Sequence, residues 1–193
     1  MITDSDSDSD FRPATGADVN TLVALYDSAS HWMLRNGIDQ WKPGDKDAGH
    51  FERRIAEGEV WLLESGGRAV GAYEVWWEDI PAWGVQPPVA GYVHRLMTAR
   101  EHAPTGAGRA LLAHGERRIA AGGRQLARLD CLSSNPRLRA YYEAAGYRVV
   151  GEEPAKEATD GSRYGVLLLE KPLGRQVLEA TAAAARPGGQ PPL

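Results

Sequence analysis

Two spacings of apolar residues alternate along the chain, one typical of helices and one typical of strands. Between residues 18 and 33, apolar side chains recur every three or four positions, which predicts an amphipathic helix. These side chains are Leu22, Leu25, Tyr26, Ala29, Trp32 and Met33. A second helical pattern covers residues 48–57 and ends at Gly58, a residue type common where helices stop.

Short runs rich in β-branched and aromatic residues lie around these helices and predict strands. We expect strands at 11–15, 59–65, 68–77, 91–98, 125–132, 147–152 and 164–171. Two further helices are expected at 106–123 and 135–146, and three prolines make residues 78–90 a loop. The order β-α-α-β-β-β-α-β-α-β-β predicts an α/β domain in which helices flank a mixed, mostly antiparallel central sheet.

One domain is expected, because 193 residues with 42% hydrophobic content can bury a single core. This domain should cover residues 11–171. Residues 1–10 form an acidic Ser/Asp repeat, and residues 172–193 form a tail rich in Ala, Pro and Gly. Such segments bury little apolar surface, so we expect the N-terminal one to be disordered.

Composition limits the class of partner. A formal net charge of −4 without a Lys/Arg run argues against nucleic-acid binding, and no apolar run approaches the roughly 20 residues of a membrane helix. The single cysteine, Cys131, excludes an internal disulfide and is interpreted as a small buried residue. We therefore expect a cytoplasmic protein, and the richness in Ala, Gly and Arg is typical of a bacterial one. A homodimer stays open. The five histidines lack the close pairing of a zinc site, so no metal is expected.

The segment 103–112, "APTGAGRALL", opens an apolar helix with two glycines, and a helix N-terminus can hold a phosphate through unpaired amides. The P-loop pattern fails because Arg109 follows the last glycine without a Lys-Ser/Thr pair. A dinucleotide loop needs a small residue where Leu111 stands and a tight turn from the strand, although Asp130 would mimic its acidic ribose ligand. The third candidate is a pyrophosphate loop for coenzyme A.

Two motifs carry a resemblance to a known family. The segments "YVHRLMTAREHAPTGAGRALL" (92–112) and "RLDCLSSNPRLRAYYEAAGYRVVG" (128–151) resemble consecutive motifs of the GNAT superfamily of acyl-CoA-dependent N-acetyltransferases. In the second, Asn135, Tyr142, Gly146 and Tyr147 stand at the family spacing. The resemblance implies a GNAT-type fold over residues 11–171 and acetyl-CoA as cosubstrate, although the first 90 residues match by element pattern only.

The resemblance also implies which positions contact acetyl-CoA. They are Leu96, Met97, Thr98, Thr105, Gly106, Ala107, Gly108, Arg109, Ala110, Asn135 and Tyr142. This chain departs from the family pattern at Ala103, where a Gln or Arg is usual, and at Pro104, which has no N–H. The loop has therefore lost one side chain and one amide that commonly face the pyrophosphate. Arg100 or Arg109 could add charge, and whether coenzyme A binds more weakly stays open.

Acetyl transfer to an amine needs a donor to the developing oxyanion, a base and an acid for the leaving thiolate. The resemblance assigns the first to the backbone N–H of Leu96 and the acid to Tyr142, and it places Asn135 beside the pantetheine or the product amide. An ordinary strand residue at Leu96 and a core aromatic at Tyr142 are the alternatives.

No motif assigns the base. The protein-lysine branch of the family carries a glutamate four residues before the Leu96 position, where this chain has Tyr92. We favour His94, because alternation along a strand puts it on the same face as Leu96 and imidazole titrates near neutral pH. Glu74 and Asp130 are its rivals, and for all three a half-exposed strand residue or a salt-bridge partner is the alternative.

The sequence thus predicts an acetyl-CoA-dependent N-acetyltransferase that acts on a primary amine of a small molecule by direct transfer. A protein N-terminal or lysine acetyltransferase and a non-catalytic acyl-CoA-binding module stay open. Residues 31–45 and the segment around Trp83 should frame the acceptor. The side chains considered for that pocket are Trp32, Trp41, Trp76, Trp77, Asp39, Asp45 and Asp47, for which core packing or an exposed loop is an equal explanation.

Overall fold

A computed structural model describes residues 10–157 and 161–174, and within them seven strands form one sheet in the order β1-β2-β3-β4-β5-β7-β6. The strands are β1 (Phe11–Pro13), β2 (Glu59–Ser65), β3 (Arg68–Trp76), β4 (Ala90–Thr98), β5 (Leu126–Leu132), β6 (Arg148–Glu157) and β7 (Arg163–Pro172). The helices are α1 (Val19–Arg35), α2 (Ala48–Glu57), α3 (Ile80–Trp83), α4 (Ala107–Ala121) and α5 (Pro136–Glu143), with a 3₁₀ helix at Gly16–Asp18.

The predicted element order is confirmed, and the sheet is mixed as expected. Among the described strands, β4 and β5 pair in parallel and all other neighbours pair antiparallel. The structure adds α3 to the predicted order. Leu173, just after β7, is buried, while the expectations for residues 1–9 and 175–193 lie outside the described residues.

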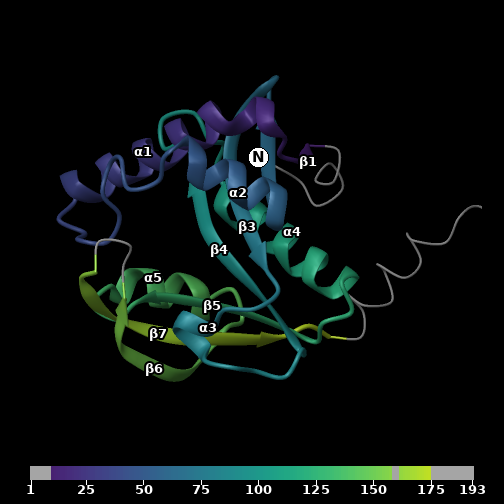
Figure 1. Ribbon diagram of the computed structural model, residues 1–193, viewed down its shortest axis with the longest axis vertical. Helices are drawn as coiled ribbons and strands as arrows, with labels where there is room; N and C mark the ends of the chain where they lie inside the picture. Colours follow the sequence, from purple (N-terminus) through teal and green to yellow (C-terminus); the bar gives the residue numbers. More distant parts are fainter. Residues whose placement is uncertain (1–9, 158–160, 175–193) are drawn as a thin grey trace, which may run out of the picture.

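Helices cover both faces of the sheet (Figure 1). On one face, α1 and α2 pack on β2, β3 and β4 through Leu22, Tyr26, Phe51, Leu62 and Met97, each almost fully buried. On the other face, α4 and α5 share a larger apolar cluster with the strands. Burying a side chain of this size contributes roughly 1.5–3 kcal/mol, so the two layers fix the sheet between them. No helix in the described part of the chain is long and apolar enough to cross a membrane.

Residues 78–90 are not a plain loop as predicted, because they contain the one-turn helix α3. The Asp79 carboxylate accepts a hydrogen bond from the Ala82 amide (3.3 Å), and Pro81 suits a first helical turn because its missing N–H is not needed there. Arg128 of β5 anchors the segment from below, since it lies 4.5 Å from the ring of Trp83 and donates to Gln86 (3.1 Å). These contacts hold α3 against β6 and β7.

Candidate active site

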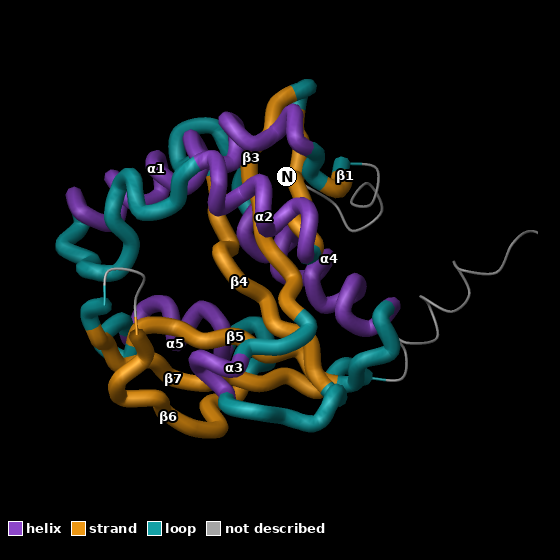
Figure 2. Tube along the Cα trace, viewed as in Figure 1, coloured by secondary structure: helices purple, strands orange, loops and turns teal. Residues whose placement is uncertain are grey.

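The two central strands part in the middle of the molecule. The parallel pairing of β4 with β5 covers Ala90–Tyr92 against Leu126–Arg128 and then stops. Beyond Tyr92, β4 continues beside β3, whereas β5 stays with β7 (Figure 2). Residues on β4 from 93 onward and on β5 from 129 onward therefore face one another across an opening in the sheet.

A β-bulge in β4 lies at this opening. Glu74 pairs with His94 and Ala72 pairs with Met97, so three residue steps on β4 oppose two on β3. Arg95 takes up the extra residue with φ of +46°, a left-handed conformation that is uncommon for a side chain other than glycine.

The bulge corrects the expectation that His94 and Leu96 share a face. Leu96 packs with the cluster beneath α4, whereas His94 stacks on Trp76 (ring centroids 4.1 Å apart) on the face of α1 and α2. Met97 returns to the α1/α2 face as part of its apolar cluster. An inserted residue shifts the alternation by one, so the two-residue spacing no longer implies a common face.

The glycine loop ends at the N-terminus of α4, close to the bulge. Gly106 precedes the helix with φ of +92°, which a residue with a side chain adopts only with strain. A Cβ on Gly108 would lie 2.9 Å from the hydroxyl of Tyr141 and 4.0 Å from the Leu96 side chain. Gly106 thus permits the turn, and Gly108 permits the close approach of α5 and β4 to the helix.

The loop amides divide into two groups. The amide of Ala107 donates to Pro104 (3.1 Å) and that of Ala110 donates to Gly106 (3.0 Å). The amides of Thr105, Gly106, Gly108 and Arg109 have no acceptor in the described part of the chain, so these four can receive a phosphate, whereas Ala107 and Ala110 are already satisfied. The loop therefore fits a pyrophosphate, despite the loss of an amide at Pro104.

The two arginines near the loop are held by aromatic rings. Arg109 lies 4.6 Å from the ring of Tyr141, and Arg100 lies 4.0 Å from the ring of Trp32. Ala103, at the family's Gln/Arg position, packs instead against the apolar cluster. Thr98 pairs with Gly71 at the end of β4.

The helix α5 supplies the candidate acid. Tyr142 is buried against the cluster shared with α4, and burial raises the pKa of its hydroxyl, which keeps the group protonated and able to donate. Asn135 caps the same helix, since its side-chain oxygen accepts from the Leu138 amide (3.0 Å). The Asn135 oxygen is thus occupied in the helix cap, which leaves its amide nitrogen for a ligand.

His94 contacts an acidic residue that was not a candidate in the sequence analysis. Its Nε2 lies 3.0 Å from the Asp79 carboxylate, which is buried at the start of α3. Burial alone would raise the pKa of Asp79, but the contact with His94 and the charge of Lys156 outweigh it and lower that pKa. Asp79 therefore stays ionised and holds the imidazole of His94 together with Trp76.

Asp130 joins this group from β5. The ligand atoms of Asp79, His94 and Asp130 all lie within 4.8 Å of one another, a grouping that the sequence spacing of the histidines did not predict. Three such ligands could hold a divalent cation. Lys156 of β6 already places its ammonium 2.7 Å from Asp130, however, so a cation of the chain itself occupies one side of the cluster.

Glu74, the other candidate base, is a buried carboxylate surrounded by hydrogen-bond donors. Its side chain is fully buried, and one oxygen, Oε2, receives hydrogen bonds from Arg54 (3.1 Å), Arg95 (2.6 Å) and Trp76 (2.7 Å). Burial opposes ionisation, but the charge of Arg95 and the surrounding donors prevail and lower the pKa of Glu74 to about 2. A carboxylate held so firmly in its ionised form is a poor proton acceptor at neutral pH, so we leave Glu74 out of the chemistry.

The tryptophans considered for the acceptor pocket do not line one common surface. Apart from Trp76 beside His94, they lie at separate places, where Trp32, Trp77 and Trp83 each face an arginine and Trp41 stacks on Tyr26. Between α1 and α2, Asp47 caps α2 and Asp39 pairs with Lys42.

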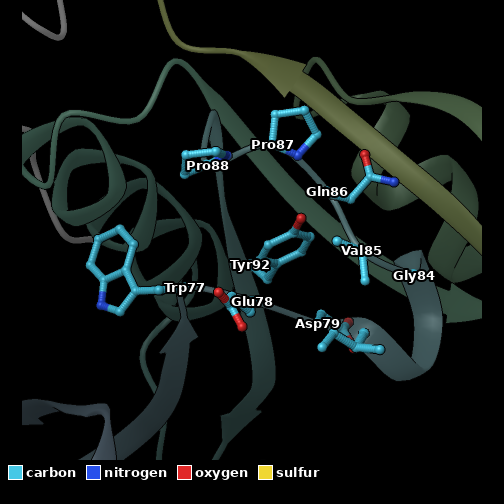
Figure 3. Close-up of a pocket in the computed structure, with 10 residues that line it drawn as sticks. Trp77, Glu78, Asp79, Gly84, Val85, Gln86, Pro87, Pro88 and Tyr92 are labelled. Atoms are coloured by element: carbon cyan, nitrogen blue, oxygen red, sulfur yellow. The ribbon is translucent and has the colours of Figure 1, made fainter.

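A cavity of about 200 Å³ lies beneath the segment 77–88 (Figure 3). Its lining includes Asp79 and Tyr92, but not His94, Leu96 or the glycine loop. Tyr92 is buried with its hydroxyl directed toward Gln86 and Pro87, and the hydroxyl accepts a hydrogen bond from Arg128 (3.3 Å). The cavity therefore adjoins Asp79 but is not lined by the candidate catalytic or cofactor-binding residues.

Four residues of this site escaped the sequence reasoning: Asp79, Arg95, Tyr141 and Lys156. Asp79 and Lys156 lie outside the two motifs, and no local pattern marks them. Tyr141 stands next to Tyr142 inside the second motif, and this adjacency was the one feature of the sequence that could have indicated Tyr141.

An open helix N-terminus beside a bulged strand that has left its parallel neighbour is the arrangement expected of an acyl-CoA-dependent transferase. Comparison with known proteins agrees. Residues 34–164 match the family described as "Acetyltransferase (GNAT) domain", and the chain belongs to this family of acetyltransferases, for which acetyl-CoA is the cosubstrate.

Relatives support the assignment. The uncharacterized N-acetyltransferase YesJ of Bacillus subtilis is 25% identical over 150 residues, which cover 73% of this chain and 82% of YesJ. A GNAT-family acetyltransferase from Listeria monocytogenes is 25% identical with a TM-score of 0.67, over 84% of this chain and 94% of that one. The phosphinothricin acetyltransferase of Sinorhizobium meliloti, solved with acetyl-CoA, is 16% identical with a TM-score of 0.64, over 86% and 88% of the chains.

Proposed function

We propose that this acetyltransferase moves the acetyl group directly from acetyl-CoA to a primary amine of a small molecule. The observation that carries the proposal is the position of His94. Its imidazole is held by Asp79 and Trp76 where β4 leaves β5, two residues before Leu96, which itself lies against the glycine loop. A base and the thioester site are thus carried by one bulged strand.

In this proposal the unpaired amides of Thr105, Gly106, Gly108 and Arg109 hold the pyrophosphate. The backbone N–H of Leu96 stabilises the developing oxyanion, His94 takes the proton of the incoming ammonium, and Tyr142 protonates the leaving thiolate. The high pKa of Tyr142, caused by its burial, suits a group that must donate. The amine nitrogen bonds to the acetyl carbon as the carbon–sulfur bond breaks. The first proton removed from nitrogen remains on His94, and the second restores the hydroxyl of Tyr142 after it has protonated the thiolate.

A small-molecule acceptor is favoured over a protein lysine by Tyr92. This residue occupies the position of the glutamate that the protein-lysine branch carries, and its ring is buried with the hydroxyl bound to Arg128. A side chain that is packed there cannot serve an acceptor. The cytoplasmic location expected from composition stays a prediction.

The test combines binding with turnover. Acetyl-CoA should raise the melting temperature, and a panel of small amines should release free thiol at a rate that depends on the amine. If acetyl-CoA stabilises the fold but neither amines nor peptides release thiol, the protein is a binding module. If only peptides are acetylated, the acceptor class is wrong.

A further inference from the structure

Two cations and one anion lie close together on the same face of the sheet as His94. Two guanidinium groups, those of Arg54 and Arg95, share one carboxylate, that of Glu74. Glu74 is ionised, so the three side chains carry a net charge of +1 in a place largely shielded from water. The exposed fractions are 17% for Arg54 and 15% for Arg95. Two further carboxylates of the site, those of Asp79, which contacts His94, and Asp130, which contacts Lys156, form no ion pair with the two guanidinium groups among the described residues.

Both guanidinium groups also keep unused donors. Each binds the same oxygen of Glu74 through a single N–H, from Nε of Arg54 and Nη1 of Arg95. Their other N–H groups have no acceptor on any residue the structure describes. A guanidinium offers five N–H donors in a planar fork that matches a carboxylate, and the unpaired nitrogens of both arginines remain accessible to a ligand.

Arg95 is directed into the acceptor side by the bulge. Regular alternation would have turned it toward α4, but the extra residue places its side chain beside Glu74, on the same face as His94. Its charge acts on groups of α1, β7 and the loop between α1 and α2. Burial and the charge of Arg95 lower the pKa of Lys46, and the same charge opposes the rise that burial causes in the pKa of Tyr26 and Tyr164. A strained backbone that aims a charge in this way is typical of a functional position.

We propose that Arg95, together with Arg54, forms a subsite for an anionic group of the acceptor, so that the acceptor is an amino acid or another small amine with a carboxylate. The proposal rests on the proposed acetyl transfer and names its substrate class. A carboxylate would accept hydrogen bonds from the free N–H groups of both arginines. A polyamine offers no anionic group to these donors.

The experiment compares amino acids with their carboxamides, which keep the side chain and the amine but lose the negative charge. Loss of that charge lowers the pKa of the neighbouring amine, so the amide offers more free amine and the comparison is biased against the proposal. For the best acceptor we expect kcat/KM for the acid to exceed that for its amide at least tenfold, mainly through KM. Equal rates for acid and amide, or a preference for diamines, would overturn the subsite.

Variants of Arg95 test whether this residue causes the preference for the acid. Arg95→Gln should raise the KM of the acid and so remove its preference over the amide. Arg95→Lys keeps a charge for Glu74, and so guards against misfolding, but loses the fork and should raise the KM of the acid alone. Arg139→Gln, on the exposed side of α5, is the matched control and should change neither value. An acid preference that survives Arg95→Lys and Arg95→Gln would refute the role of this residue.

Binding separates this proposal from the proposed function. Calorimetry with the N-acetylated amino acid and coenzyme A should show binding that weakens at least tenfold in Arg95→Lys. If this carboxylate-dependent binding occurs but no amine is acetylated, the subsite stands and the catalytic proposal fails. If amines without a carboxylate are acetylated efficiently and the N-acetylated amino acid does not bind, the catalytic proposal stands and the subsite is wrong.

Discussion

Replacing Glu74 by glutamine isolates the contribution of the buried charge to the fold. Glutamine keeps the size and one oxygen acceptor, but it removes the negative charge between Arg54 and Arg95. Two partly buried cations then face each other without an anion. Breaking a buried ion pair by removing one partner typically destabilises a protein by about 3–5 kcal/mol.

The pKa of Glu74 gives an independent magnitude. Its fall from 4.5 to about 2 corresponds to roughly 3 kcal/mol of stabilisation at neutral pH, at about 1.4 kcal/mol per pKa unit. Because the pKa is lower in the folded state, this stabilisation is fully present above pH 4.5 and is lost as the pH falls through about 2. At pH 3 only about 1 kcal/mol remains.

Urea unfolding at pH 7 and pH 3 measures this difference. The Glu74→Gln variant should be less stable than the wild type by about 3 kcal/mol at pH 7 and by about 1 kcal/mol at pH 3. Glu59→Gln is the matched control, because Glu59 pairs with a single arginine, Arg118, at a more exposed site and should cost less than about 1 kcal/mol. A loss below about 0.5 kcal/mol at pH 7, or a loss that does not shrink at pH 3, would refute the reasoning.

Three further predictions concern the chemistry and the cofactor loop. His94→Gln should lower turnover about 100-fold without changing the thermal shift with acetyl-CoA, and a variant as active as the wild type would exclude His94 as the base. Tyr142→Phe should lower turnover about 100-fold while the thermal shift with acetyl-CoA stays the same, and unaltered turnover would remove Tyr142 from its role. Gly108→Ala should weaken acetyl-CoA binding about tenfold by calorimetry, because its Cβ displaces the hydroxyl of Tyr141. Adding Tyr141→Phe should restore part of that affinity, and failure to do so would contradict the steric explanation.

Much of the fold could be predicted because its signals are local. Helical spacing in residues 18–33 and strand-like runs on either side of the glycine pair at 66–67 depend only on neighbouring residues, and the structure confirms both elements. The short helix α3 was missed because its capping residue, Asp79, stands in a segment dominated by prolines. Its stability depends on packing against β6 and β7, which follow much later in the chain.

The sequence by itself determined the element order, the family and the glycine loop, because periodicity and motif spacing are properties of neighbouring residues. Only the tertiary structure decided the faces and partners of the site. The bulge at Arg95 arises from pairing with β3, and it separates His94 from Leu96 in a way that strand alternation cannot anticipate. Glu74 is surrounded by cations because α2 and the bulged β4 both reach it. Charge balance at a site is a sum over residues from distant elements, so it is fixed only when the chain has folded.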